Sequence, residues 1–475
     1  MGALRKEKQD EEAVNGSTTV DKLRRVSSAV SSTISRLSSG PVVLASDSNK
    51  PQDDTLPVTS RQEGTWWSMA SNVYLATMGV AILNLPYAMA SITWVGGVVS
   101  GVIAYMVSFY TMYLMLELHE HKGRRFNRYR ELGELAFGPK GRTIAAVPQY
   151  MDLVGDSIAF LVLSGQSMRA FYQIVCDGSC PSYGQSAWIV TIGCVALILC
   201  LLPDMSSISF ISAGAALAGI AYTAIAFGGS ISEGLHMEHR TGRHAEWNLD
   251  GKSTVAGMFD AWAALGTFVY PFGAHVVTLE LQAQIPSPFF KTALVGSIVG
   301  YAAAGVGMGS VAFAGYWAFG EQAGENIFIG TLSGPKWMLA LADACVVANL
   351  LGQWQLFIMP IFDAMEGSLQ RHVKEVKIWM RYIVRILFTV GATFVAVSLP
   401  FFGDFVQLIG AVAVLPDAFI LPALIYQRVK KPPPSHWKFW ANWGIIVAAV
   451  IVLILAAAGA GRSTILSAIH NEYYQ

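Results

Sequence analysis

Charged residues are scarce in this chain. Of its 475 residues, 13% are Asp, Glu, Lys or Arg and 53% are hydrophobic, whereas about 25% of the residues of a soluble globular protein are charged. This deficit excludes an ordinary soluble enzyme. Beyond residue 63, nearly every stretch of about twenty residues is apolar enough to cross a hydrocarbon layer of about 30 Å. The composition therefore predicts an all-α polytopic membrane protein.

Cysteine and metal-binding patterns are also sparse. The chain has five cysteines, but neither a C-x-x-C pair nor a His/Cys cluster with zinc spacing, so we expect no metal and no cofactor. No nucleophile and base pair or phosphate loop appears, which argues against an enzyme. Lys plus Arg equals Asp plus Glu, so the charge gives no indication of a nucleic-acid partner. Cys176 and Cys180 flank a short polar loop, where a disulfide and two free thiols are both possible.

Eleven apolar segments separated by polar loops are predicted to be membrane helices. They run approximately over residues 65–91, 93–118, 143–174, 186–202, 207–230, 255–282, 290–318, 336–365, 378–399, 404–426 and 437–460. Residues 1–62 are polar throughout, lack the apolar core of a signal peptide and are predicted to form a disordered tail. We expect a first five-helix repeat at 63–230, a second at 255–426, and the eleventh helix with the C-terminus at 437–475.

The distribution of basic residues predicts the orientation in the membrane. When the segments are connected in alternation, Lys and Arg concentrate in one set of loops, above all in 122–142, 371–381 and 428–438. Basic loops stay in the cytosol during insertion. The N-terminal tail is therefore predicted to be cytoplasmic, and an odd number of helices places the C-terminus outside.

The first and sixth segments each contain a helix-breaking sequence, GVAILNLP at 79–86 and FVYPFGAH at 268–275. Proline removes a backbone donor and glycine admits unusual dihedral angles, so both segments should unwind locally. At membrane depth, freed backbone groups are tolerated only where they line a cavity. We therefore predict a substrate site formed by Gly79, Val80, Ala81, Ile82, Leu83, Asn84, Phe268, Tyr270, Phe272 and Gly273. Simple proline kinks are the alternative.

The two breaks lie one five-helix repeat apart, as expected when two inverted halves each contribute a discontinuous helix. The half-helix ends could then bind both charges of a zwitterion. The positive N-terminal ends would face the carboxylate, and the unwound carbonyls would face the ammonium group.

Three ionisable side chains in the apolar segments are candidates for proton coupling. His275 lies beside the sixth-segment break, and an imidazole changes charge readily near neutral pH. Asp152 and Asp156 are one helical turn apart and share a face, so their mutual repulsion favours binding of a proton. Gln149 lies on the same stripe and could bind the substrate. Purely structural roles, such as a neutral core histidine or an ion-paired carboxylate, are the alternatives.

Three further acids lie within apolar segments, but no break or partner distinguishes them. They are Asp260, Asp343 and Asp417.

Several sequence blocks in one order resemble a known family. They include NLPYAM at 84–89, RYRELG at 128–133, HVVTLE at 275–280, MPIFDAME at 359–366 and PFFG at 400–403. From Trp66 to the C-terminus the chain resembles the amino acid/auxin permease family, and is most like its plant lysine/histidine-transporter-type branch. The resemblance implies a leucine-transporter-type inverted-repeat fold, eleven helices and proton-driven uptake across the plasma membrane.

The chain departs from this pattern at both breaks. Ala81 and Asn84 stand where the amino-acid branch has a glycine-rich break, and residues 270–275 are closer to the pattern of auxin carriers. Three functions therefore remain open: a proton-coupled amino acid symporter, a proton-coupled carrier of auxin-like indole acids, and a nutrient sensor that binds solute without transporting it.

Overall fold

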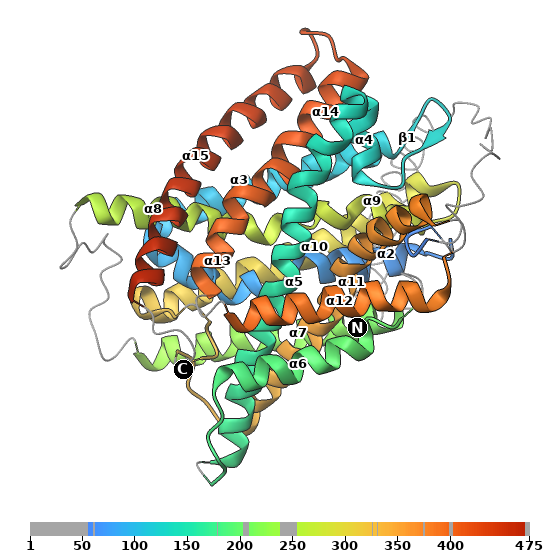
Figure 1. Ribbon diagram of the computed structural model, residues 1–475. Helices are drawn as coiled ribbons and strands as arrows, with labels where there is room; N and C mark the ends of the chain where they lie inside the picture. Colours follow the sequence, from blue (N-terminus) through green and yellow to red (C-terminus); the bar gives the residue numbers. More distant parts are fainter. Residues whose placement is uncertain are drawn as a thin grey trace, which may run out of the picture. The chain divides into compact units, whose positions relative to one another are not determined.

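The protein is almost entirely helical (Figure 1). The computed structural model describes residues 56–59, 62–177, 179–202, 209–237, 254–324, 326–329, 331–373, 376–398 and 402–470. Within these residues, nine helices are long and apolar enough to cross a membrane, and α6 (Gln185–Leu199) is apolar but shorter. A predominantly helical architecture with several candidate membrane spans is therefore confirmed, while the number of eleven spans and the two five-helix repeats stay predictions.

Apart from Arg124 in the second strand, the regular elements belong to one compact unit, Ser48–His121 with Arg125–Gln475. The α-helices besides α6 are α2 (Trp66–Thr77), α3 (Leu85–His119), α4 (Tyr129–Phe137), α5 (Pro139–Cys176), α7 (Ser209–Met237), α8 (Thr254–Val269), α9 (His275–Ala283), α10 (Phe289–Phe319), α11 (Lys336–His372), α12 (Ile378–Ser398), α13 (Phe402–Ile409), α14 (Leu421–Lys430) and α15 (Trp437–His470). Shorter elements are the 3₁₀ turns η2 (Val80–Leu83), η3 (Tyr270–Phe272) and η4 (Gly320–Gln322), the π-helix η5 (Gly410–Ile420), and the strands β1 (Glu120–His121) and β2 (Arg124–Arg125).

Both predicted helix breaks are present. The chain leaves α2 at Thr77, passes through η2 and enters α3, where Pro86 occupies the first turn and needs no backbone donor. Further along, Thr93 interrupts α3 with non-helical dihedral angles, φ 64° and ψ 179°. This kink lies at the boundary between the predicted segments 65–91 and 93–118. In the sixth segment, α8 and α9 follow one another on either side of η3 (Figure 1).

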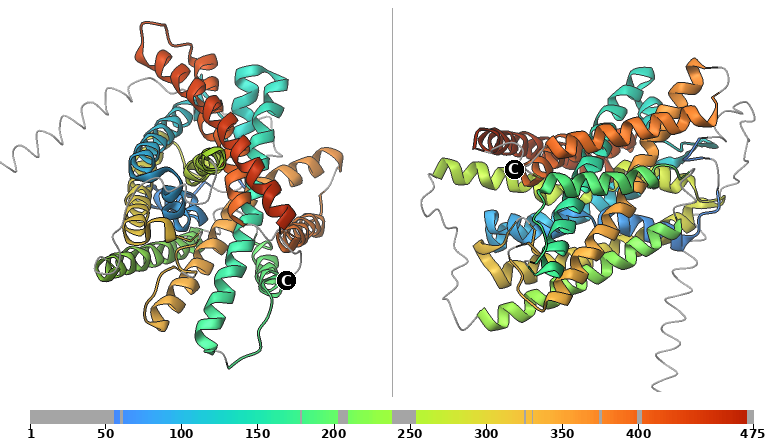
Figure 2. Two further views of the ribbon diagram at one scale, coloured as in Figure 1. Left: turned by 90° about the vertical axis from the view of Figure 1, so that its left-hand side faces the viewer. Right: turned by 60° about the horizontal axis from the view of Figure 1, so that its bottom comes forward.

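The two broken segments are surrounded by unbroken helices. α2 packs against α10 and α7, and α5 packs against α11. α15 packs against α8 and η5 along one side of the helices (Figure 2). Large apolar side chains on the outer faces, such as Val95, Ile198 and Ile451, are exposed. Such a surface suits contact with lipid rather than with water.

Three expectations need correction or completion. The segment at 404–426, which was expected to be an uninterrupted α-helix, contains the π-helix η5 over eleven residues. A π-helix is wider than an α-helix because its hydrogen bonds span five residues. The expected tail, 1–62, lies largely outside the described residues, but within it Leu56 and Val58 are buried, so the packed part of the chain begins before residue 62. Cys176 and Cys180 form a disulfide at the end of α5, which resolves the two alternatives.

The π-helix approaches α8 so closely that only glycine fits. A methyl group on Gly410 would collide with the carbonyl oxygen of Gly266, and one on Gly266 would lie 2.5 Å from the carbonyl oxygen of Gln407. We therefore expect Gly410→Ala to lower the free energy of unfolding by about 1–3 kcal/mol. Thermal unfolding of the purified protein in detergent measures this change.

Gly391→Ala in α12 is the matched control, because nothing lies within 4 Å of the added methyl group and alanine favours a helix over glycine by up to about 1 kcal/mol. Equal melting temperatures for the two variants would contradict the predicted contact between η5 and α8.

Candidate functional site

The first break leaves backbone carbonyls without helical partners, and neighbouring helices supply donors. The side-chain amide of Gln353 in α11 donates to the carbonyl oxygen of Leu75. The hydroxyl of Tyr222 in α7 donates to the carbonyl oxygen of Met78 at 3.3 Å. These donors come from unbroken helices, so the unwound segment is held from outside itself.

The second break is held in the same way, mainly by α5. The amide of Gln149 donates to the carbonyl oxygen of Val276 at 2.9 Å. The hydroxyl of Tyr270 donates to Asp156 at 2.5 Å, within the range of a charge-assisted hydrogen bond. The 3₁₀ turns η2 and η3 contact each other. The two breaks therefore meet, as the sequence predicted.

A small cavity lies at this meeting point. It is lined by Ala76, Thr77, Gly79, Asp156, Phe160, Tyr270, Pro271, Gly273, Gln353 and Phe357. Its volume of about 20 Å³ is room for about one water molecule. Both breaks, α5 and α11 contribute to its wall, so a solute bound here would contact all four. In this conformation the cavity is too small to hold one.

The predicted substrate-binding residues fall into two groups. Gly79, Tyr270 and Gly273 line the cavity, and so does Asp156, which was predicted for proton coupling. The other predicted residues lie nearby or elsewhere: Ile82, Leu83, Asn84, Phe272 and Gln149 are buried outside the cavity wall, Phe268 lines a different cavity, and the side chains of Val80 and Ala81 lie outside the described residues.

Several residues of the cavity wall escaped the sequence reasoning. Phe160 and Phe357 pack edge to face with their ring centroids 5.2 Å apart, but an apolar side chain in an apolar helix gives no signal of its own. Gln353 is a buried amide in such a helix. Its polarity at membrane depth indicates an interhelical hydrogen bond, which it forms to Leu75, but does not by itself indicate a place in the cavity wall.

The three predicted proton-coupling residues occupy different surroundings. Asp156 lies on the cavity wall beside Tyr270, whereas Asp152 is buried outside the wall. His275 is fully buried, and both ring nitrogens have partners: Nδ1 lies 3.0 Å from the carbonyl oxygen of Phe272, and Nε2 lies 3.0 Å from the hydroxyl of Thr111. Nε2 also lies 3.1 Å from the carbonyl oxygen of Ser108, so the ring bonds to groups of the protein interior and lies outside the cavity wall.

A network of charged and polar groups joins α4 to the membrane helices α5, α9 and α11. Arg128, at the start of α4, binds both carboxylate oxygens of Asp363 in α11, at 2.6 and 3.1 Å. The backbone N–H of Tyr129 donates to Glu280 in α9 at 3.5 Å, and Gln149 in α5 donates to the same carboxylate oxygen at 3.0 Å. α4, which lies in a loop, therefore ties α5, α9 and α11 together at this end.

Tyr129 completes this network with a hydroxyl that donates to the backbone oxygen of Asp417 in η5 at 2.6 Å. Burial, followed by the charges of Asp417 and Glu280, raises the pKa of Tyr129 well above its ordinary value. The hydroxyl consequently keeps its proton and remains a donor.

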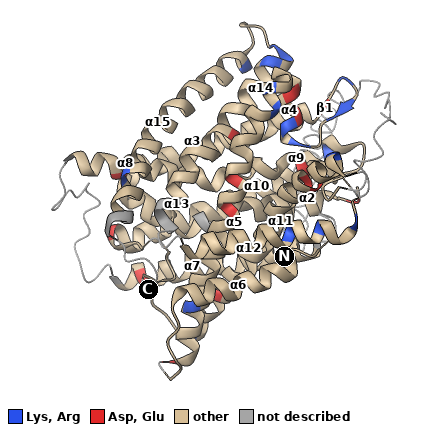
Figure 3. Cartoon of the chain, in the orientation of Figure 1, with Lys and Arg blue, Asp and Glu red and all other residues tan. Residues whose placement is uncertain are grey.

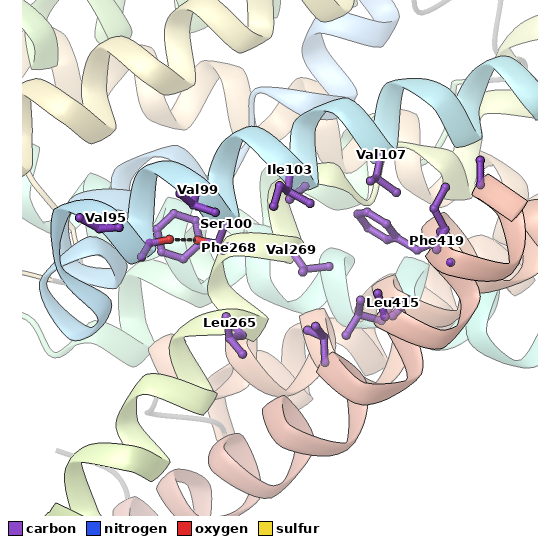
Figure 4. Close-up of a pocket in the computed structure, with 18 residues that line it drawn as sticks. Val95, Val99, Ser100, Ile103, Val107, Leu265, Phe268, Val269, Leu415 and Phe419 are labelled. Atoms are coloured by element: carbon purple, nitrogen blue, oxygen red, sulfur yellow. Dashed lines mark hydrogen bonds between the residues drawn. The ribbon is translucent and has the colours of Figure 1, made fainter. Parts of the chain in front are cut away.

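A second, larger cavity of about 730 Å³ lies between α3, α8, η5 and α15 (Figure 4). Val99, Ile103, Phe268 and Leu415 are among its apolar lining residues. Its hydroxyl group, that of Ser100, donates to the carbonyl oxygen of Gly96 at 2.7 Å within α3. A zwitterion would find no partners for its charges there, so the small cavity remains the candidate site.

Over the described part of the chain, no group of three His, Cys, Asp or Glu side chains could hold a metal ion.

Comparison with known proteins identifies what the chain resembles. Residues 62–466 match the family described as transmembrane amino acid transporter protein. The chain is 33% identical to Lysine histidine transporter-like 6 of Arabidopsis thaliana, over 86% of this chain and 93% of the relative. It is 30% identical to Lysine histidine transporter-like 1 of the same plant, over 90% and 94%.

Among solved structures, a substrate-bound, outward-open Na⁺-coupled sialic acid symporter superposes with a TM-score of 0.50 at 13% identity, over 89% of this chain and 93% of the symporter. Because the identity is low, this likeness concerns the fold alone.

The ion pair between Arg128 and Asp363 is buried, with side chains 5% and 2% exposed. We expect Arg128→Gln to lower the free energy of unfolding by up to about 3–5 kcal/mol, because it removes the guanidinium that binds both oxygens of the buried Asp363 carboxylate and leaves Arg130, at 3.5 Å, as the remaining cation beside it. Thermal unfolding is the measurement, and adding Asp363→Asn should restore part of the loss.

Arg142 and Glu134 provide a control pair at 3.2 Å, with both side chains 45% exposed. Arg142→Gln should change the free energy of unfolding by less than about 1 kcal/mol. An equal decrease in the free energy of unfolding in Arg128→Gln and Arg142→Gln would show that the buried pair stabilises the protein no more than the exposed one.

Proposed function

Since the chain belongs to the transmembrane amino acid transporter family, we propose that it is a proton-coupled symporter that imports amino acids across the plasma membrane by alternating access. The observation that carries this proposal is the cavity enclosed by the two helix breaks, with Asp156 and Tyr270 in its wall. The substrate, the proton and the lipid bilayer are its partners.

The architecture that we propose has two inverted five-helix repeats, 63–230 and 255–426, followed by an eleventh helix. In this arrangement α6, and α2 with η2, would be the two spans beyond the nine long helices. The N-terminus would be cytoplasmic and the C-terminus extracellular. The gathering of Lys and Arg around α4 and α14 supports this orientation (Figure 3), because basic segments stay in the cytosol.

The cavity wall offers partners for both charges of an amino acid. The Asp156 carboxylate would bind the ammonium group, as an ion pair supported by the Tyr270 hydroxyl. α9 begins at His275, two residues after Gly273, which lines the cavity. Helix N-termini attract anions, so the substrate carboxylate would lie there. Phe160 and Phe357 would then contact the side chain.

The small volume of the cavity fits a closed state in an alternating cycle. One end is closed by the network of Arg128, Asp363 and Glu280 around α4. Opening toward the cytosol would require this network to separate, and opening to the outside would require the two breaks to move apart. Admission of an amino acid therefore needs a change of conformation rather than a change of side-chain rotamer alone.

An auxin-like indole acid is the second candidate, and residues 270–275 are the feature that favours it. It carries a carboxylate but no ammonium group, so Asp156 would repel it unless that carboxyl were protonated. The amino acid proposal makes use of Asp156, whereas the indole proposal must neutralise it. A sensor without transport would use the same cavity but show no flux.

Uptake into proteoliposomes tests the proposal directly. With an inward proton gradient, labelled amino acids from a complete panel should accumulate, and dissipation of the gradient should abolish accumulation. Flat uptake of every amino acid would refute symport. Competition by indole acids alone would favour the second candidate, and binding without flux would favour a sensor.

Replacement of Asp156 tests whether this carboxylate binds the ammonium group of an amino acid. Asp156→Asn should raise the apparent KM for amino acids about 10- to 100-fold, because a charge-assisted hydrogen bond worth about 1.5–3 kcal/mol is lost. Initial uptake rates over a range of concentrations provide the KM. Asp343→Asn is the matched control, since Asp343 is also a buried acid but lies outside the cavity wall. An unchanged KM in Asp156→Asn would contradict the assignment.

A further inference from the structure

Two buried carboxyl groups meet where α5 packs against the π-helix η5. Asp152 in α5 and Asp417 in η5 are both fully buried, and their carboxyls interact with each other where the two helices pack together. None of their four oxygens is bonded to a donor from another side chain. Other interior acids of this region differ, because Asp156 is bonded to Tyr270 and Asp363 to Arg128.

The surroundings of the pair supply no compensating charge. Among the described residues, no lysine or arginine side chain donates a hydrogen bond to Asp152 or Asp417. The titratable groups that act on them are Asp156 on α5, Tyr270 on η3 and Tyr129 on α4. From α9, Glu280 lies beside Tyr129, and His275 packs against Phe419 of η5. Of these, Asp156 and Glu280 add negative charge, and Tyr129 binds the backbone oxygen of Asp417 rather than its carboxyl.

Two adjacent ionised carboxylates cannot persist in such a place, because burial and mutual repulsion both oppose the second charge. A single proton resolves the conflict. It converts one carboxyl into a donor, which forms an O–H···O⁻ hydrogen bond to the other and leaves one charge spread over the pair. Two carboxyl groups that share a site commonly share a proton in this way.

We propose that the transported proton is carried between Asp152 and Asp417, on the two sides of the contact between α5 and η5. This assignment rests on the proposed proton-coupled function and names Asp417 as a proton-binding partner. One O–H bond forms when the proton enters from one side of the membrane, and the same bond breaks when it leaves on the other side. Nothing else is made or broken.

The location of the pair links the proton to the substrate cavity. A methyl group added to Gly273, which lines the cavity, would lie 3.3 Å from Oδ2 of Asp152. The Asp152 carboxyl and a substrate in the cavity would therefore both lie against the unwound backbone at Gly273. When the proton leaves, repulsion between the two carboxylates favours separation of η5 from α5. That movement acts on the second break, because η5 also contacts η3 and α9.

Proteoliposomes that contain the full-length protein test this inference. The readout is the factor by which an inward proton gradient stimulates uptake of the transported amino acid, with counterflow exchange measured in the same vesicles. Exchange needs no net proton movement, so it reports folding and substrate binding. In Asp417→Asn we expect the stimulation to disappear while exchange remains detectable. Asp152→Asn should lose the stimulation in the same way. The double variant should show no greater loss of stimulation than either single variant.

Asp343→Asn is the matched control, a buried acid in α11 whose carboxyl oxygens also lack donors. It should keep the wild-type stimulation. Asp417→Glu retains a titratable carboxyl and should recover part of the coupling. Full stimulation in Asp417→Asn, or equal loss in Asp343→Asn, would overturn the inference while leaving symport intact. Absence of stimulation in the wild-type protein would instead refute the proposed function, and this inference with it. Should Asp417→Asn fail to fold, Asp152→Asn decides by the same criteria.

Discussion

The structure depends on the requirement that backbone polar groups inside a membrane must find partners within the protein. An unbroken helix meets this requirement by itself, but a broken one does not. At the two breaks the donors come from α11, α7 and α5, through Gln353, Tyr222 and Gln149. The unwound segments are consequently buried between the surrounding helices, which supply these donors. The cavity lies where the two segments meet in this interior.

The interior acids obey the same requirement, each in a different way. Asp363 is neutralised by Arg128, close to the basic end of the structure. Asp156 takes a hydrogen bond from Tyr270 at the cavity wall. Asp152 and Asp417 interact with each other and have no donor from another side chain. The three solutions differ in what offsets the buried charge: an arginine, a tyrosine hydroxyl or a second carboxyl.

Much of this arrangement could be anticipated from the sequence. The long helices and the two breaks were predicted close to their observed positions, and α4 lies in the basic loop that carries the RYRELG block. The π-helix was not predicted, because apolar residues at 410–420 satisfy α- and π-helical backbones equally. Phe160 and Phe357 were missed for a related reason: hydrophobicity indicates that a side chain avoids water, but not which neighbour it contacts.

By itself, the sequence determined where the chain crosses a membrane and where two of the crossings break. Both are local properties, since hydrophobicity acts along each segment, and proline and glycine act on their own backbone. Only the tertiary structure decided which acid lines the cavity and which one faces another acid. Those pairings join residues far apart in the chain, such as Tyr270 and Asp156, which are separated by 114 positions. They depend on how each helix is rotated against its neighbours, and one helical turn along α5 is enough to separate Asp152 from Asp156.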